Sequence, residues 1–133
     1  MSSPPDLAVA EIARTHELDL VVLFGSRATG RARSDSDVDI AAHSRRGPLD
    51  LRQRMDLQAA LRRVYDADID LVDLMRADPL LLKQIFACAI PLFEEPGRFY
   101  AARLHAFHRY QDYRPFLRLE RRAVRRALGL DAD

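Results

Sequence analysis

The chain has 133 residues, of which 48% are hydrophobic and 31% charged, and its net charge is +1. This composition is typical of one globular domain with a real core, and its balanced charge gives no global attraction to nucleic acid. No apolar run approaches the roughly 20 residues of a membrane span, and residues 1–6 lack the basic and apolar regions of a signal peptide. The single cysteine, Cys88, lies in an apolar segment, where we expect it in the core, and cannot form an internal disulfide. We therefore expect a cytoplasmic protein.

The first third of the chain predicts two strands that are separated by a short polar loop. A helix is expected over about 6–15, with Asp6 as its cap. The apolar run at 18–24 predicts a buried strand that stops abruptly at a Gly-Ser pair. Acidic and apolar residues then alternate at about 37–43, which predicts a second strand. The loop between them, at 26–33, is expected to contain a short helical turn.

The middle of the chain alternates helix and strand. An amphipathic helix is predicted over 49–65 and a strand over 69–74. Asp78-Pro79 opens a second helix, because Asp is a good N-cap and Pro suits the first helical position. A short strand at about 91–94 is expected to close the sheet. The order of elements predicts an α/β (α+β) fold, a small mixed sheet with helices mainly on one face.

The chain changes character after residue 96, and we divide it into a core at 1–96 and a helical extension at 97–133 within the same domain. Residues 98–133 contain nine arginines and four acids. Their apolar residues fall on one helical stripe, made of Phe116, Leu119, Ala123 and Ala127. The arginines opposite form a solvated face or meet an acidic patch on a partner protein. Contact with RNA phosphates is the less favoured reading.

Asp37 and Asp39 form the most informative acidic pair in the sequence. Side chains on a strand change face at every residue, so these two carboxylates share one face while Val38 points to the other. Neighbouring carboxylates repel and raise each other's pKa unless a cation compensates for their charge. Oxygen ligands of this kind suit Mg²⁺. The alternation therefore predicts a divalent-cation site.

Gly25 and Ser26 end the preceding strand in a bend that can hold phosphate. Such a turn exposes backbone N–H groups where a short helix begins, which favours an anion. Gly25 lets the backbone approach a ligand closely, and Ser26 adds a hydroxyl donor. A phosphate cradle beside paired carboxylates is the apparatus for reaction at a nucleoside triphosphate. The chain contains neither a P-loop nor a Gly-x-Gly-x-x-Gly motif.

Gly25-Ser26, ten further residues and Asp37-Val38-Asp39 match the Gly-Ser-x10-Asp-x-Asp signature of DNA polymerase β-like nucleotidyltransferases. More narrowly, the chain resembles the minimal nucleotidyltransferase (MNT) antitoxins of HEPN–MNT toxin–antitoxin pairs over about residues 7–95. The resemblance implies the polymerase β palm-like fold, ATP as donor and two Mg²⁺ ions. It also implies a hetero-oligomer with a HEPN toxin, whose RNase activity is silenced when AMP is transferred to one of its tyrosines.

The resemblance further implies a third acid on a later strand, for which Asp68, Asp70 and Asp73 are candidates. Asp70 matches the family pattern and is our prediction. Asp68 shares its face by period two and stays open, whereas Asp73 lies on the other face. In the implied mechanism, Asp37 and Asp39 bridge the metal ions, and Asp70 holds one of them and can accept the proton of the attacking hydroxyl.

The predicted nucleotide-binding residues are Gly25, Ser26 and Arg27. The resemblance implies that the Ser26 hydroxyl and the backbone of this segment hold the β- and γ-phosphates. Arg27 either adds positive charge there or is solvated, and both roles stay open.

Two other functions remain as alternatives: a non-catalytic antitoxin that neutralises its toxin by binding alone, and a nucleotidyltransferase acting on a small molecule. Arg103, His108 and Tyr110 fit the Arg-x4-His-x-Tyr signature of HEPN toxins, but the 36 residues from 98 to 133 are too few for a HEPN helical bundle. We expect the histidines of this segment on the helix surface or at a partner contact.

Overall fold

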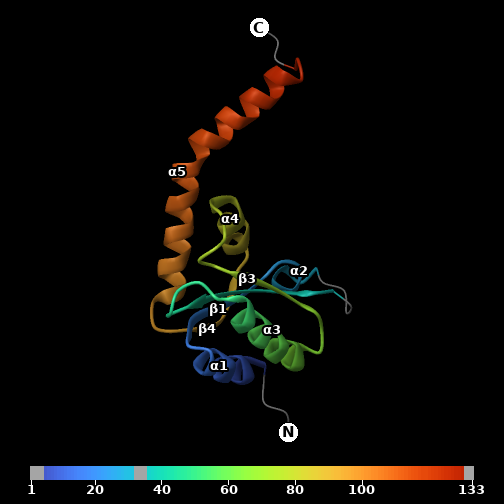
Figure 1. Cartoon of the computed structure of the whole chain (residues 1–133), viewed down its shortest axis with the longest axis vertical. Helices are drawn as coiled ribbons and strands as arrows, with labels where there is room; N and C mark the ends of the chain where they lie inside the picture. The colour runs from blue at the N-terminus through green and yellow to red at the C-terminus, as the bar shows by residue number, and fades with distance from the viewer. Residues whose placement is uncertain (1–4, 32–35, 131–133) are drawn as a thin grey trace.

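The computed structural model describes residues 5–31 and 36–130. Its elements follow the predicted alternation of helix and strand (Figure 1). They are α1 (Pro5–Thr15), β1 (Leu18–Phe24), α2 (Ser26–Thr29), β2 (Val38–Ser44), α3 (Leu51–Tyr65), β3 (Ile69–Asp73), α4 (Pro79–Ala87), β4 (Ile90–Glu94) and α5 (Arg98–Ala127).

The strands form one mixed sheet in the order β3-β2-β1-β4. β1 lies antiparallel to both β2 and β4, whereas β2 and β3 run parallel. The parallel pair is connected through α3, as a parallel connection requires. Because β1 is antiparallel to β2, the end of β1 and the starts of β2 and β3 meet at the same edge of the sheet. The predicted small mixed sheet is confirmed.

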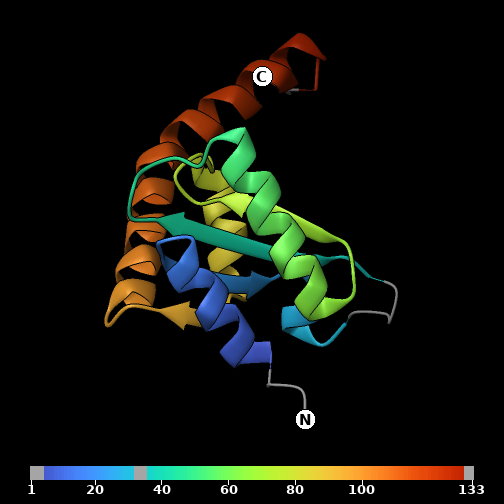
Figure 2. The same cartoon turned by 60° about the horizontal axis from the view of Figure 1, so that its bottom comes forward.

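One face of the sheet is covered by α1 and α3. Their buried residues Val9, Ala13, Leu57 and Leu61 pack with alternate strand residues such as Ile40. Figure 2 shows both helices lying across this face.

The opposite face is covered by α4 and the first part of α5. Leu82 and Ile85 of α4 and Ala106 of α5 form a second core cluster with Val22 and Ala41 of the central strands. Helices therefore lie on both faces, rather than mainly on one as we expected. The reason is that β1 and β2 place apolar side chains on both sides, so both sides need cover.

Capping residues fix the starts of α3 and α4. The Asp50 side chain accepts a hydrogen bond from the Gln53 N–H, and the Gln53 side chain accepts one from the Asp50 N–H, which completes a capping box. The Asp78 side chain accepts from the Leu81 N–H, with Pro79 at the first helical position, as predicted. Cys88 follows α4 and is exposed, so our expectation of a core cysteine was wrong.

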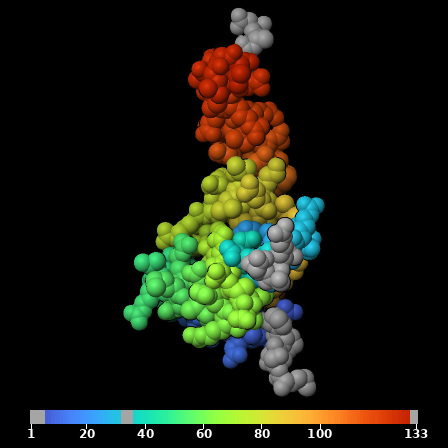
Figure 3. Space-filling model, turned by 90° about the vertical axis from the view of Figure 1, so that its right-hand side faces the viewer, coloured from blue at the N-terminus to red at the C-terminus, as the bar shows by residue number. Residues whose placement is uncertain are grey.

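The last helix, α5, is much longer than the others and contains Pro115 in its interior. Figures 1 and 3 show its final part standing away from the rest of the molecule. In the described part of the chain, no helix is both long and apolar enough to cross a membrane.

Candidate active site

The parallel pairing of β2 with β3 places Asp39 directly beside Asp70. Val38 and Ile40 alternate with Asp39 and are fully buried toward α1 and α3. Ile69 and Leu71 alternate with Asp70 on β3 and are buried in the same core cluster. Both carboxylates therefore point to the opposite face of the sheet, at its edge, where Asp39 is half-buried and Asp70 exposed.

The acids interact electrostatically. The pKa of the Asp39 carboxyl is raised above its usual value, first by burial, then by the charge of Asp70 and a side-chain hydrogen bond with it, and finally by the charge of Asp37. Asp39 thus lies against Asp70, and the charge of Asp37 is close enough to act on the same carboxyl. An uncompensated cluster of this kind is characteristic of a functional site.

Gly25 approaches this cluster from β1. Phe24, the last residue of β1, pairs with Asp39, and Gly25 follows with φ of 73° and ψ of −155°. This backbone conformation is essentially restricted to glycine. A Cβ atom built on Gly25 would overlap Oδ2 of Asp39. The Gly-Ser bend and the carboxylates are therefore direct neighbours, as the motif predicted.

Ser26 begins α2, the predicted short helical turn. Gly30 ends this turn in the left-handed conformation, and the Thr29 hydroxyl donates to the Ser26 carbonyl. The first N–H groups of a helix have no carbonyl partner within it. These amides therefore start beside the carboxylates. The last two residues of the predicted loop, 32 and 33, lie outside the described residues.

Arg27 is turned toward other neighbours. Its Nη2 donates to the Ser36 carbonyl at 2.7 Å. Its charge lowers the pKa of the Tyr65 hydroxyl, although burial and Asp6 outweigh this effect and raise it. Among the described residues, the buried Arg27 Nε has no hydrogen-bond partner. The observed contact links α2 to the segment that leads into β2.

The other two candidates for the third acid have different partners. Asp68 precedes β3, is exposed, and forms an ion pair with Arg62 at 3.1 Å. Asp73 is buried and accepts hydrogen bonds from the N–H groups of Leu49, at 2.8 Å, and Met75, at 3.0 Å. Of the three candidates, Asp70 is the one that lies opposite Asp39.

Sequence reasoning missed a polar cluster at the other end of the same face. Asp19 is only 7% exposed. Its Oδ1 lies 2.7 Å from Nδ1 of His43, and its Oδ2 lies 3.1 Å from Nε of Arg98. His43 and Arg98 also line a cavity of about 370 Å³ between α4 and α5. The available signal was an acid inside the apolar run of β1. The cluster ties β1, β2 and the start of α5 together.

The family of the chain follows from its sequence. The family model described as polymerase beta, nucleotidyltransferase matches residues 8–97. The chain belongs to this nucleotidyltransferase family. A comparison with curated proteins found no match.

Solved structures agree with this assignment. This nucleotidyltransferase is 28% identical to a chain of a toxin–antitoxin complex with AMP-PNP, with a TM-score of 0.75, over 93% of this chain and 98% of that one. It is 26% identical, with a TM-score of 0.69, to a chain of the complex between a tri-AMPylated HEPN toxin and an MNT antitoxin from Shewanella oneidensis, over 94% of this chain and 96% of that one. The resemblance to MNT antitoxins is therefore confirmed.

A further match is shorter. A structure described as a minimal nucleotidyltransferase is 32% identical, with a TM-score of 0.57, but covers only 65% of this nucleotidyltransferase and 87% of that chain. This match covers about as much of the chain as the family model does, at residues 8–97, whereas the matches to the toxin–antitoxin complexes cover considerably more.

Proposed function

We propose that this nucleotidyltransferase is an antitoxin that transfers AMP from ATP to a tyrosine of a cognate HEPN RNase toxin and thereby neutralises it. The observation that carries this proposal is the pairing of Asp39 with Asp70 beside the Gly25 bend, in a chain of the nucleotidyltransferase family. The similar complexes with AMP-PNP and with an AMPylated toxin support the donor and the partner.

The nucleotide would be held by the segment that begins at Gly25. The Ser26 hydroxyl and the first amides of α2 would contact the β- and γ-phosphates, because no side chain separates this bend from the carboxylates. A direct contact between Arg27 and the nucleotide stays a prediction. The hydrogen bond from Arg27 to the Ser36 carbonyl instead supports a role in positioning the segment that precedes Asp37.

The carboxylates fit Mg²⁺ in chemistry and charge. In the described part of the chain, no three His, Cys, Asp or Glu side chains converge into a ready-made metal site. Yet the Asp39 pKa is raised by burial and then by the charges of Asp70 and Asp37, so a cation would relieve the repulsion among these carboxylates. Asp37, Asp39 and Asp70 would hold the metal. When bound, Mg²⁺ supplies charge neutralisation at the triphosphate and lowers the pKa of the attacking hydroxyl.

The reaction itself is an exchange of one P–O bond for another. The tyrosine oxygen attacks the α-phosphorus of ATP and forms the new bond. The bond from that phosphorus to the oxygen bridging the α- and β-phosphates breaks, and pyrophosphate leaves with the electron pair. The phenolic proton passes to a carboxylate, which we assign to Asp70. The Gly25 bend would keep the triphosphate in place while this occurs.

A reducing cytoplasm agrees with the proposal, because the only cysteine, Cys88, is an exposed thiol. A HEPN RNase would have its RNA substrates in that compartment. We propose the cytoplasm as the location of the complex.

The proposal is tested with the purified chain, the cognate toxin, Mg²⁺ and ATP labelled at the α-phosphate. Label should move to the toxin and should be lost when Asp37 and Asp39 are changed together to Asn or when EDTA removes the metal. Transfer that survives both treatments would contradict the site. Inhibition of the toxin without any movement of label would instead support neutralisation by binding alone.

A further inference from the structure

The final part of α5 presents an apolar surface that nothing in the described chain covers. Every residue from 118 to 130 is exposed. Five large apolar side chains in this part of α5 and just after it are 56–66% exposed: Phe116, Leu119, Val124, Leu128 and Leu130. Scattered exposed apolar residues need no explanation, but a continuous set on one helix does.

These residues divide the helix into two halves. At about 100° per residue, the apolar side chains from Phe116 to Leu128 fall on one half of the helix surface, with Glu120 among them. The arginines occupy the other half, and they are Arg114, Arg118, Arg121, Arg122, Arg125 and Arg126. A helix of this pattern normally buries its apolar half against a neighbour.

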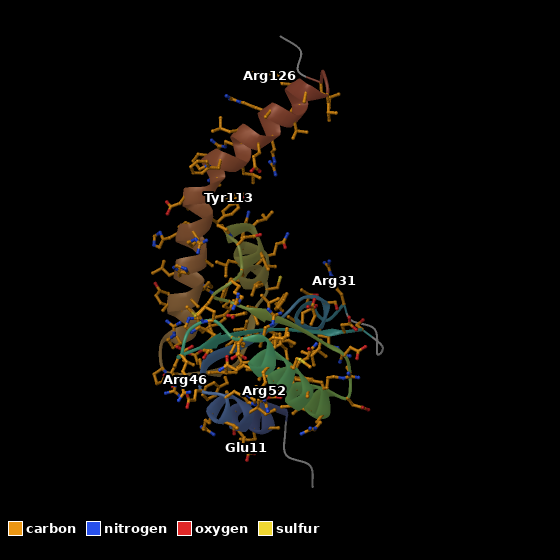
Figure 4. All side chains as sticks on the ribbon, viewed as in Figure 1. Glu11, Arg31, Arg46, Arg52, Tyr113 and Arg126 are labelled. Atoms are coloured by element: carbon orange, nitrogen blue, oxygen red, sulfur yellow. The ribbon has the colours of Figure 1, made fainter. Side chains whose placement is uncertain are left out.

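Pro115 lies at the point where α5 stops packing against α4 and extends away from the rest of the molecule. Before it, α5 packs on α4: Phe86 and Phe99 stack with ring centroids 5.9 Å apart, and Nζ of Lys83 lies 4.0 Å from the centroid of the Tyr110 ring. Proline removes a backbone hydrogen bond and bends a helix. Figure 4 shows Tyr113 still close to α4 and Arg126 far from it.

We propose that residues 116–128, the docking segment, lay their apolar half into a groove of the cognate HEPN toxin, with the arginines facing an acidic rim. This inference rests on the proposed function for the identity of the partner. The matches to toxin–antitoxin complexes cover 93–94% of the chain, whereas the match to a minimal nucleotidyltransferase covers 65%. At that coverage, the matches to chains of toxin complexes must include most of the extension at 97–133.

Other occupants explain less of the segment. RNA would meet the arginines but leave the apolar half in water. A second copy of the chain would bring two arginine-rich helices together, which like-charge repulsion opposes. A protein groove with an acidic rim satisfies both halves at once.

The test compares two double variants in a chain that already carries Asp37→Asn and Asp39→Asn, so that no modification of the toxin occurs. Phe116→Asp with Leu119→Asp alters the docking segment at positions 63% and 60% exposed. Leu51→Asp with Met55→Asp is the matched control on α3, at positions 73% and 60% exposed. Affinity for the purified toxin is measured by calorimetry, and unfolding by circular dichroism.

We expect the docking-segment variant to bind the toxin at least about tenfold more weakly, as loss of central apolar anchors does, and the control variant to bind normally. Both should melt like the parent, because all four substituted side chains are at least 60% exposed. Equal affinity of all three chains would overturn the inference. The inference would also fail if the docking-segment variant bound the toxin normally but no longer formed a dimer of this chain, or no longer bound RNA. If the docking result holds while the wild-type chain transfers no label, docking stands and the proposed transferase function fails.

Discussion

Asp39 and Asp70 lie side by side on parallel strands, and the raised pKa of Asp39 is a direct consequence of that pairing together with its burial. The fold thus brings like charges together in the place where Gly25 keeps the backbone close. Such an arrangement lowers the stability of the free chain and suits a site that binds a cation.

Asp39→Asn should abolish AMP transfer and yet raise the melting temperature of the metal-free chain. Because the folded-state pKa is raised, the folded chain holds this proton more tightly than the unfolded chain. Stability is therefore lost as pH rises from the usual value of 3.8 through the raised pKa, and the full cost is present above that raised pKa. The expected gain is on the order of one to a few degrees, measured by calorimetry at pH 7 with EDTA.

Addition of Mg²⁺ supplies the control for this prediction. It should raise the melting temperature of the wild-type chain and have less effect on the Asp39→Asn variant, because the variant lacks a ligand. A variant that melts several degrees below the wild type in EDTA would show that the Asp39 carboxylate stabilises the free fold.

Gly25→Ala should remove activity, with Gly30→Ala as its matched control. Both glycines have positive φ, of 73° and 76°, so both substitutions strain the backbone, and the strain is greater at Gly25, whose ψ of −155° lies outside the left-handed region that Gly30 occupies. Only the Cβ at Gly25 meets Asp39, whereas the one at Gly30 has nothing within 4 Å. We expect transfer to fall by at least about a hundredfold for Gly25→Ala, in line with misplacement of reacting groups. Similar losses for the two variants would mean that strain alone is responsible.

Asp73→Asn should act on stability, in contrast to Asp70→Asn. The amide can accept only one of the two backbone hydrogen bonds that the Asp73 carboxylate accepts from Leu49 and Met75. An unsatisfied buried group costs about 1–3 kcal/mol, or roughly 3–10 °C in Tm for a domain of this size. Asp70→Asn should leave Tm unchanged or higher and abolish transfer. Melting curves and label transfer, measured for both variants, test whether Asp70 or Asp73 is the third acid of the site. If Asp73→Asn abolished transfer without lowering Tm and Asp70→Asn did the opposite, Asp73 would be the functional acid.

Arg27→Gln should lower kcat for transfer while KM for ATP changes less than about threefold, because the observed hydrogen bond positions the segment before Asp37. Arg31→Gln is the control: Arg31 is exposed and points away from the sheet (Figure 4). A large rise in KM with normal kcat would instead support direct contact between Arg27 and a phosphate.

Local sequence patterns predicted most of the helices and strands, and they predicted Asp37 and Asp39 of the candidate site. Period-two alternation placed Asp37 and Asp39 on one face, and capping residues placed the start of α4 at Asp78-Pro79. The neighbourhood of Asp39 and Asp70 depends on the register of parallel strands far apart in the chain, which local patterns do not encode. The resemblance to a family, and not periodicity, singled out Asp70.

The remaining differences have the same origin. The ion pairs of Asp19 with His43 and Arg98 join three elements, so no stretch of sequence shows them. Helices cover both faces because the apolar residues of β1 and β2 face both ways, a feature that the order of elements alone does not reveal. The overlap between a Gly25 Cβ and Asp39 also became visible only in three dimensions.

The most direct test of the account is the intact mass of the cognate toxin after incubation with this chain, Mg²⁺ and ATP. We predict that the mass of the toxin increases by whole AMP units on tyrosine with the wild-type chain and stays unchanged with Asp39→Asn or Asp70→Asn. An unchanged toxin mass with the wild-type chain, or AMP addition by both variants, would contradict it.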